Sequence, residues 1–345
     1  MKILNISYAL PSQEVSNENL IEEIVEKNRK NLSPKELENV ETQMRRFFKM
    51  SGTVTRYHRG IGERALDFAV KAGKAALKKA GVKPEEVDLL IYAGVARGWM
   101  EPATANLFQS ELGLTSATCF DVMDACASWI RSLAIAKTFL AQKAYKLVMI
   151  LNCEFIFREY ANFDFESSDD VENAFSAFTI GEAATATLLT SNGSEDDSYF
   201  SFKTWGDKHG LCKIPLPNAD DFSPNNSSDG LKPMSFFTMP GELLSFTVRK
   251  LVSHFKETQA IVSKVHDIFI GHAVSVTSTS RVVKLLGLDP SLVFETHARF
   301  GNTVAASLPL ALAVAVAEGK LVRGMRVSLL MGSAGVSTAV GSFTY

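Results

Sequence analysis

The chain has 345 residues, 46% of them hydrophobic and 21% charged, which is the composition of a globular protein with a large core. Its formal net charge of -2 argues against nucleic acid as the main partner. The four cysteines show neither the spacing of a zinc site nor the density of a disulfide scaffold, so we expect no metal and a reducing, cytoplasmic location. No signal peptide and no run of 18 apolar residues for a membrane span is visible.

The N-terminal third predicts strands and helices in alternation. Ser16 has the character of a helix cap, and Gly81 is a typical helix stop. In chain order we expect a strand at 2–8, helices from 16 and over 27–50, an extended piece at 50–57, a helix at 63–80 and a strand at 89–95. The apolar character of the strand at 89–95 is nearly continuous, which suits a sheet covered on both faces.

The same order of elements then occurs twice. Asp88-Leu89-Leu90 begins a strand in one half, and Asp267-Ile268-Phe269 begins its counterpart. In each half we expect a helix ending in Leu-Gly-Leu, a strand (118–122 or 293–296), a small-residue turn with Cys126 or Asn302, an Ala/Leu-rich helix, and a closing strand (146–151 or 326–331). The repeat predicts a duplicated α/β fold, with halves at 1–190 and 191–345 whose active residues meet near a pseudo-twofold axis. Residues 220–230 have the composition of a surface insertion.

Cys126 lies where the strand at 118–122 gives way, through small residues, to a helix over about 127–144. The N–H groups and the dipole at a helix N-terminus favour a thiolate, which makes Cys126 a candidate nucleophile. A cysteine in an apolar run is more often a small buried hydrophobe. The nucleophile hypothesis therefore needs partner residues elsewhere in the chain.

Two polar residues in the second half are candidate partners of Cys126. His272 ends the first strand of that half, and Asn302 lies in the turn that mirrors the cysteine turn. Ligands and catalytic groups gather at such strand ends in open α/β sheets. His297 is a second candidate base, although it lacks a mirrored position.

These residues stand in motifs that resemble those of β-ketoacyl-ACP synthase III enzymes in the thiolase superfamily. The motifs are Asp124-Ala125-Cys126-Ala127, Gly271-His272 and the run from Phe300 to Leu310, with further counterparts at 8–11, 181–184 and 332–335. The resemblance covers essentially the whole chain. It implies the thiolase fold, in which two α/β halves form five αβαβα layers, and it implies a homodimer.

A second set of motifs is similar to the branch of this superfamily that joins two acyl thioesters head to head in olefin biosynthesis. It consists of Arg97 to Ala105, Phe120-Asp121-Val122, and Trp205 before Cys212. That resemblance implies that Glu101 reaches across the dimer as the base that removes an α-proton. A glutamate in a loop is more often a solvated carboxylate, so both interpretations of Glu101 stay open.

The resemblance implies a ping-pong Claisen condensation without a cofactor, with acyl-CoA or acyl carrier protein thioesters as substrates. Cys126 would take the acyl group, and its own N–H with those of Gly335 and Val336 would bind the oxyanion. His272 and Asn302 would hydrogen-bond the second thioester carbonyl. The residues expected at the substrate are Trp129, Ser275 and Phe300. The carbanion arises either by CO2 loss or by deprotonation through Glu101.

Two departures from the family pattern bear on this expectation. Asp124 is an extra acid near the thiol, and a carboxylate pointing at the sulfur would oppose its ionisation. Trp129 is bulky enough to shorten an acyl pocket. Because no residues match a clamp for the CoA adenine, delivery by a carrier protein stands beside delivery by CoA. Two alternatives are an acyltransferase with an oxygen or nitrogen acceptor and a silent partner of a heterodimer, and the presence of all three motif residues argues against the second.

Overall fold

The computed structural model describes residues 1–193, 196–222, 231–262, 265–272 and 274–345. Two mixed sheets form its centre. The first has the order β1 (Lys2–Ala9), β7 (Ala183–Thr190), β6 (Leu147–Glu154), β4 (Leu89–Ala93) and β5 (Thr118–Val122). The second has the order β8 (Tyr199–Thr204), β14 (Ser337–Thr344), β13 (Arg326–Ser333), β11 (Ile268–Gly271) and β12 (Val293–Phe294).

The two sheets have the same topology. In the first, β5, β4 and β6 are parallel, and β7 and β1 follow antiparallel. In the second, β12, β11 and β13 are parallel, and β14 and β8 follow antiparallel. The repeated order of elements predicted from sequence is therefore present in the structure. The exact division of the chain at residue 190 stays a prediction.

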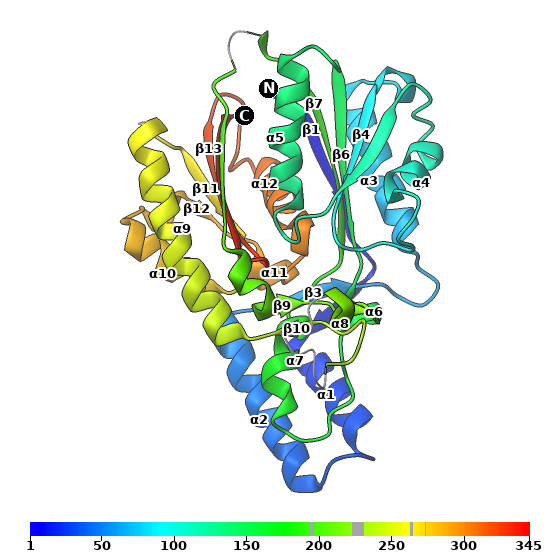
Figure 1. The fold of residues 1–345 in the computed structure, drawn as a ribbon, viewed down its shortest axis with the longest axis vertical. Helices are drawn as coiled ribbons and strands as arrows, with labels where there is room; N and C mark the ends of the chain where they lie inside the picture. Colours follow the sequence, from blue (N-terminus) through cyan, green and yellow to red (C-terminus); the bar gives the residue numbers. More distant parts are fainter. Residues whose placement is uncertain (194–195, 223–230, 263–264, 273) are drawn as a thin grey trace.

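Helices alternate with the sheets to give five layers, as Figure 1 shows. The outer layer at the first sheet holds α3 (Ala65–Ala80) and α4 (Thr104–Glu111), and the outer layer at the second holds α9 (Pro240–Val262) and α10 (Val276–Leu286). Between the sheets lie α5 (Ser128–Ala141) and α12 (Ser307–Ala317). The αβαβα arrangement expected from the motifs is confirmed.

Burial explains the character of the central elements. Every residue of β4 is buried, which matches its continuous apolar run. Residues Leu308 to Ala315 of α12 are all buried as well, and a helix that is apolar all round must be covered on every side. At the outer layer, α3 ends where Gly81 takes a left-handed backbone with φ of 68°.

A smaller lobe extends from one end of the sheets, at the bottom of Figure 1, around α1 (Asn17–Asn28), α2 (Pro34–Ser51) and α7 (Asp170–Phe178). Ser16 and Ser33 cap α1 and α2 with reciprocal capping boxes. Apolar side chains from the three helices pack together in one cluster, and Cys126 packs against it. The base of this lobe thus forms part of the surroundings of the predicted nucleophile.

Short elements complete the described chain. They are the paired strands β2 (Gln13–Ser16) with β3 (Thr55–His58) and β9 (Cys212–Lys213) with β10 (Phe237–Thr238), the helices α6 (Phe157–Tyr160), α8 (Ala219–Phe222) and α11 (His297–Phe300), and the 3₁₀ turns at 84–86, 206–211, 290–292 and 304–306. Residues 223–230 of the predicted insertion lie outside the described residues. No described helix has both the length and the apolar character needed to cross a membrane.

Several boundaries differ from the sequence prediction. The charged stretch at 27–50 resolves into the end of α1 and a helix that begins only at Pro34. The closing strands are longer than expected, because β6 continues to Glu154 and β13 to Ser333. Both extensions bring polar side chains to the strand ends where the motif residues lie.

Candidate active site

The cysteine turn connects β5 to α5 over residues 123–127. Ala125 has a φ of +46°, a left-handed backbone that is uncommon for residues other than glycine and is often found at functional sites. The Ser128 hydroxyl closes the turn, since it accepts from the Asp124 N–H (2.8 Å) and donates to the Ala125 carbonyl (2.7 Å). Cys126 therefore lies at a fixed corner two residues before the helix begins.

A residue of the second half holds this turn in place. The Ser333 hydroxyl, at the end of β13, accepts from the Ala127 N–H (3.2 Å) and donates to the Asp124 carbonyl (3.2 Å). Both bonds join groups more than 200 residues apart in sequence. The position of Cys126 thus depends on both halves of the fold.

The electrostatic surroundings of Cys126 differ from the sequence expectation. Burial raises the pKa of the Cys126 thiol well above its usual range, and nearby Cys212 and Glu154 raise it further. Its own backbone N–H acts in the opposite direction by favouring the thiolate. Burial outweighs the helix N-terminus and so favours the thiol over the thiolate.

Asp124 raises the pKa of the Cys126 thiol in the direction that the sequence suggested, but its effect is small. Its carboxylate accepts two charge-assisted hydrogen bonds from Arg131, at 2.9 Å from Nε and 2.8 Å from Nη2. The Arg131 guanidinium lies 3.8 Å from the centre of the Phe202 ring on β8. Arg131 partly neutralises the Asp124 charge, and Asp124 raises the Cys126 pKa less than burial, Cys212 or Glu154 does.

His272 follows directly after β11, and its backbone N–H donates to Leu330 of β13 (2.8 Å). Among the described residues, neither ring nitrogen of His272 has a hydrogen-bond partner, and both are buried. Burial, with a smaller effect of His297, lowers the pKa of His272 to about 3. The ring is a neutral imidazole, which can donate one hydrogen bond to an incoming ligand.

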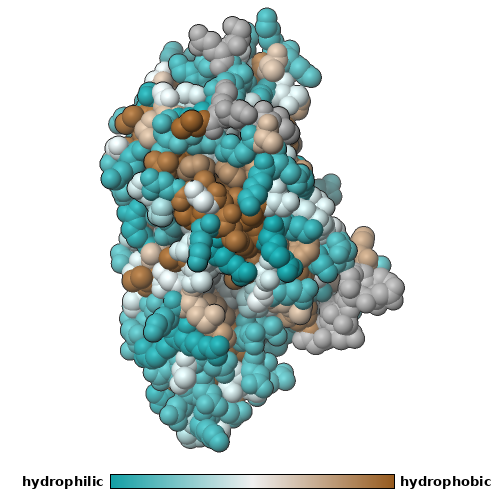
Figure 2. All heavy atoms as spheres, turned by 90° about the vertical axis from the view of Figure 1, so that its left-hand side faces the viewer, coloured by the Kyte–Doolittle hydropathy of each residue, from teal (hydrophilic) through white to brown (hydrophobic). Residues whose placement is uncertain are grey.

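His272 also lines a cavity of about 70 Å³ between α9, α10 and the second sheet, together with apolar side chains such as Val248 and Val282. Figure 2 shows the side of the molecule on which α9 and α10 lie, with apolar side chains gathered near its middle. His297, the second candidate base, is itself buried and bonded to the Thr53 hydroxyl at 2.8 Å. It lies close enough to act on the pKa of His272.

The Asn302 turn is fastened to the segment that precedes β7. Asn302 donates its N–H to Thr179 (2.8 Å) and accepts from the Gly181 N–H (3.1 Å). The approach is so close that a Cβ on Gly181 would lie 1.9 Å from the Phe300 carbonyl. Gly301, with a φ of +66°, is equally confined against Thr179. Two glycines of the recognised motifs are thus required by backbone contact.

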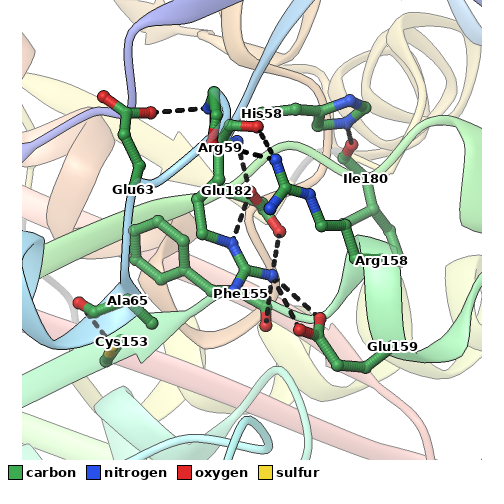
Figure 3. A network of polar contacts seen from close by, with 11 residues as sticks. His58, Arg59, Glu63, Ala65, Cys153, Phe155, Arg158, Glu159, Ile180 and Glu182 are labelled. Atoms are coloured by element: carbon green, nitrogen blue, oxygen red, sulfur yellow. Dashed lines mark hydrogen bonds and ion pairs between the residues drawn. The ribbon is translucent and has the colours of Figure 1, made fainter.

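A buried ion pair stabilises the segment on which Asn302 rests (Figure 3). Glu182 has no exposed surface and pairs with Arg59 at 3.0 Å, and Arg59 also pairs with the half-exposed Glu159 at 2.9 Å. Arg158 donates to the Arg59 carbonyl, and His58 bonds the Ile180 carbonyl at 2.9 Å. The network joins the end of β3, the helix α6 and the segment before β7.

The structure brings the cysteine, histidine and asparagine segments together at the carboxyl ends of the parallel strands. Ser333 and Leu330 of β13 bind the cysteine turn and His272 respectively. Val304, two residues after Asn302, packs in the same apolar cluster as Cys126. These contacts come from both sheets, as expected for a site between two duplicated halves.

Other predicted site residues have different surroundings. Glu101 is exposed on the loop between β4 and α4. Trp129 is fully buried in the core and donates its indole N–H to Thr187 (3.0 Å). Ser275 caps α10 by accepting from the Ser278 N–H (3.0 Å).

The remaining predicted residues concern the oxyanion and the substrate. The Val336 N–H donates to the Trp205 carbonyl at 3.1 Å, so it is already engaged, while the same loop also contains Gly335. The Phe300 ring lies 6.0 Å from that of Tyr57, centre to centre.

Sequence reasoning missed two groups near the thiol. Glu154 is fully buried at the end of β6, and the partly buried Cys212 on β9 acts on the Cys126 pKa. No sequence pattern in 152–154 indicates that the strand extends to Glu154, because the extension depends on pairing with β7. Among the described residues, no three His, Cys, Asp or Glu side chains form a possible metal site.

The fold and the strand-end site define a thiolase-type condensing enzyme. Family models agree: 3-oxoacyl-[acyl-carrier-protein] synthase III matches residues 120–207, and the C-terminal part of that synthase matches residues 258–345. The chain is 30% identical to the β-ketoacyl-[acyl-carrier-protein] synthase III of an Enterobacter species over 263 residues, which cover 75% of this chain and 77% of the relative. The corresponding synthase of Symbiobacterium thermophilum is 29% identical over 79% of this chain and 81% of its own.

This protein belongs to the β-ketoacyl-ACP synthase III family and is a Claisen-condensing acyltransferase of that type. Solved structures agree in fold. Synthase III from Aquifex aeolicus has a TM-score of 0.80 at 24% identity and covers 100% of this chain and 99% of its own. Xanthomonas campestris OleA with bound lauric acid and lauroyl-CoA has a TM-score of 0.83 at 21% identity and covers 99% and 98%.

Proposed function

We propose that Cys126 is the residue that takes up the acyl group. The observation that carries this proposal is the corner at 123–127, which is held from both halves and presents a thiol at the start of α5. Attack on a thioester converts the thiol into a thioester and releases the carrier thiol. The acylated sulfur carries no proton, so the high pKa of the Cys126 thiol applies only to the enzyme before acylation.

His272 and Asn302 then act on the second thioester. A neutral imidazole and an amide both donate hydrogen bonds to a carbonyl that gains negative charge as an enolate forms. The pKa of about 3 supports the neutral form of His272 at every physiological pH. The enolate attacks the acyl-cysteine, a carbon–carbon bond forms, and the Cys126 sulfur leaves as thiolate.

The carbanion arises, in this proposal, by direct α-deprotonation through Glu101. Its exposed loop is suited to reach a neighbouring subunit, and the motif from Arg97 to Ala105 resembles that of the branch that joins two acyl thioesters. The proposal includes a homodimer, cytoplasmic location, and delivery of the acyl groups on CoA or an acyl carrier protein. The product is a β-keto thioester or the acid derived from it.

A second candidate function is transfer of the acyl group from Cys126 to an oxygen or nitrogen acceptor. The exposed position of Glu101 in the single chain favours it, because that reaction needs no base at the α-carbon. The two functions differ in whether a carbon–carbon bond forms.

The experiment compares Glu101→Gln with the wild type, using malonyl and non-malonyl second thioesters side by side. With non-malonyl substrates, condensation falls by roughly 10² to 10⁴ while loading of Cys126 persists. Glu111→Gln, on an exposed glutamate at the end of α4, is the matched control and behaves like the wild type. If Glu101→Gln joins two acyl thioesters at the wild-type rate, Glu101 is not the base.

A further inference from the structure

Glu154 is a fully buried carboxylate that the proposed mechanism does not use. It is the last residue of β6, the strand next to β4 in the first sheet. Burial raises its pKa to about 7, against the opposing effect of backbone hydrogen bonds. Burying an ionisable carboxylate is costly unless its oxygens are well bonded, so its partners indicate what its position achieves.

The partners of Glu154 are backbone N–H groups of two separate loops. Oε1 accepts from the Val95 N–H (3.0 Å) and Oε2 from the Ala96 N–H (3.2 Å). The Ala305 N–H also lies close enough to the Glu154 carboxylate to lower its pKa, and residues 304–306 pack against β6. Val95 and Ala96 begin the loop that ends at Glu101, and Ala305 is three residues after Asn302. One carboxylate therefore contacts both loops.

The loop at 94–101 is shaped around this carboxylate. A Cβ on Gly94 would lie only 2.7 Å from Glu154 Oε1, so a glycine is needed at that position. Arg97 folds back on the same loop and donates to the Gly94 carbonyl (3.2 Å), and the Tyr92 hydroxyl donates to the Ala96 carbonyl. Glu154 is the only described carboxylate to which the Val95 and Ala96 N–H groups donate.

We propose that Glu154 is a positioning residue, which fixes the loop of Glu101 and the turn of Asn302 around Cys126. The inference rests on the roles proposed above for these three residues. In this arrangement Glu154 affects the second half-reaction more than the first, because Glu101 and Asn302 both act after Cys126 has been loaded.

Glu154 also influences the thiol through its charge, since it is among the groups that raise the Cys126 pKa. The ionisable groups that face Glu154 come from several elements. They are Cys126 before α5, Arg97 on the loop, Tyr92 on β4, the neighbouring Cys153, and Tyr160 on α6. Among these groups Arg97 is the cation, and it favours the ionised carboxylate that the N–H groups require.

The test uses Glu154→Gln, which preserves size but places an NH2 group where one oxygen accepted a hydrogen bond. We expect Cys126 loading within a few-fold of wild type and condensation at least about tenfold slower. Hydrogen exchange at 94–101 and 303–306 should become faster. The pH profile for alkylation of Cys126 by iodoacetamide should move to lower pH, because a negative charge beside the thiol is lost.

Glu182→Gln is the matched control, since Glu182 is equally buried at the start of the neighbouring strand but pairs with Arg59 instead. It should leave the alkylation profile and the exchange at 94–101 unchanged. If Glu154→Gln fails to fold, Gly94→Ala takes its place, because a Cβ there displaces the loop and keeps the charge. That variant should slow condensation without moving the alkylation profile.

The proposal is overturned if Glu154→Gln keeps the wild-type ratio of loading to condensation together with wild-type exchange at 94–101. It is also overturned if loading and condensation fall equally, as they would after a general loss of structure. Hydrogen exchange and thiol alkylation need no substrate. Failure of the proposed reaction is therefore distinguishable from failure of the role assigned to Glu154.

Discussion

The two halves share one topology and differ in the chemistry at corresponding strand ends. In the first half, the ends of β4, β5 and β6 lead to the Glu101 loop, Cys126 and Glu154, and in the second half the ends of β11, β12 and β13 carry His272, Asn302 and Ser333. The first half thus holds the thiol and the carboxylates, and the second holds neutral hydrogen-bonding groups. The comparison indicates that the shared framework fixes where the site lies, while the residues at the strand ends decide what each half contributes.

The cysteine turn and the Asn302 turn also resemble each other in backbone conformation. Ala125 before Cys126 has a φ of +46°, and Val304 after Asn302 has a φ of +49°. A left-handed backbone is rare for alanine and exceptional for the β-branched valine. A left-handed residue of this kind is maintained only where surrounding contacts hold the backbone. Here the hydrogen bond to Ser333 holds the cysteine turn, and the hydrogen bond from Gly181 holds the Asn302 turn.

The largest effect expected from a change in the second half comes from removing its neutral donor. His272→Ala should slow condensation by roughly 10² to 10³, the usual effect of losing one donor to a developing oxyanion. Loading of Cys126 should persist, because the first half carries that step. Separate assays of acyl-enzyme and product measure this division.

His266→Gln is the control for His272→Ala, since His266 is a buried histidine before the opposite end of β11. It should leave the ratio of loading to condensation unchanged. Equal loss of loading and condensation in His272→Ala would show that the two halves do not divide the reaction.

A second change breaks the contact through which the first half supports the Asn302 turn. In Gly181→Ala the new Cβ would lie 1.9 Å from the Phe300 carbonyl, so the turn must move. We expect a loss of about 1–3 kcal/mol or more in the free energy of unfolding and slow condensation. Gly210→Ala, where a Cβ meets no atom within 4 Å, is the control in urea denaturation. Wild-type stability of Gly181→Ala would contradict the close backbone contact between Gly181 and the Asn302 turn.

A third expected effect is the pH dependence of stability, which has opposite signs for the buried titratable groups of the two halves. The pKa of Glu154 rises from 4.5 to about 7 on folding, so its contribution to stability is present below pH 4.5 and is lost as the pH rises through about 7. The pKa of His272 falls from 6.5 to about 3, so its contribution is present above pH 6.5 and is lost as the pH falls towards 3. Each shift corresponds to at most roughly 3 to 5 kcal/mol.

Urea denaturation between pH 5 and pH 8 measures these contributions. The free energy of unfolding of Glu154→Gln, relative to wild type, should increase over this range. The free energy of unfolding of His272→Gln, relative to wild type, should decrease as the pH rises from 5 to 6.5. If the difference in the free energy of unfolding between each variant and the wild type did not change with pH, neither Glu154 nor His272 would be buried as described.

Sequence predicts much of this fold wherever local patterns determine the secondary structure. The strand at 118–122, the helix cap at Ser16 and the end of α3 at Gly81 are present as predicted, because each depends on near neighbours in the chain. The duplication is also readable, since the order of elements repeats. The roles assigned to individual site residues stay predictions.

What sequence did not reveal depends on tertiary contacts. The strand β6 continues through Glu154 because β7 pairs with it along its full length, which no pattern in 152–154 shows. Asp124 pairs with Arg131, which lies 7 residues further along the chain on α5. The pKa of the Cys126 thiol is high because the packed fold buries the sulfur. Charge placement was therefore the least predictable property of the site.

The most direct test of the account is the mass of the intact protein after exposure to an acyl-CoA, followed by addition of a second thioester. For the wild type, we predict one acyl adduct, on Cys126, which disappears as a product with a new carbon–carbon bond forms. Cys126→Ala should form no adduct while keeping its circular dichroism spectrum. A stable adduct on Cys126→Ala, or loss of the wild-type adduct without a new carbon–carbon bond, would contradict the claim that Cys126 carries the acyl group into a Claisen condensation.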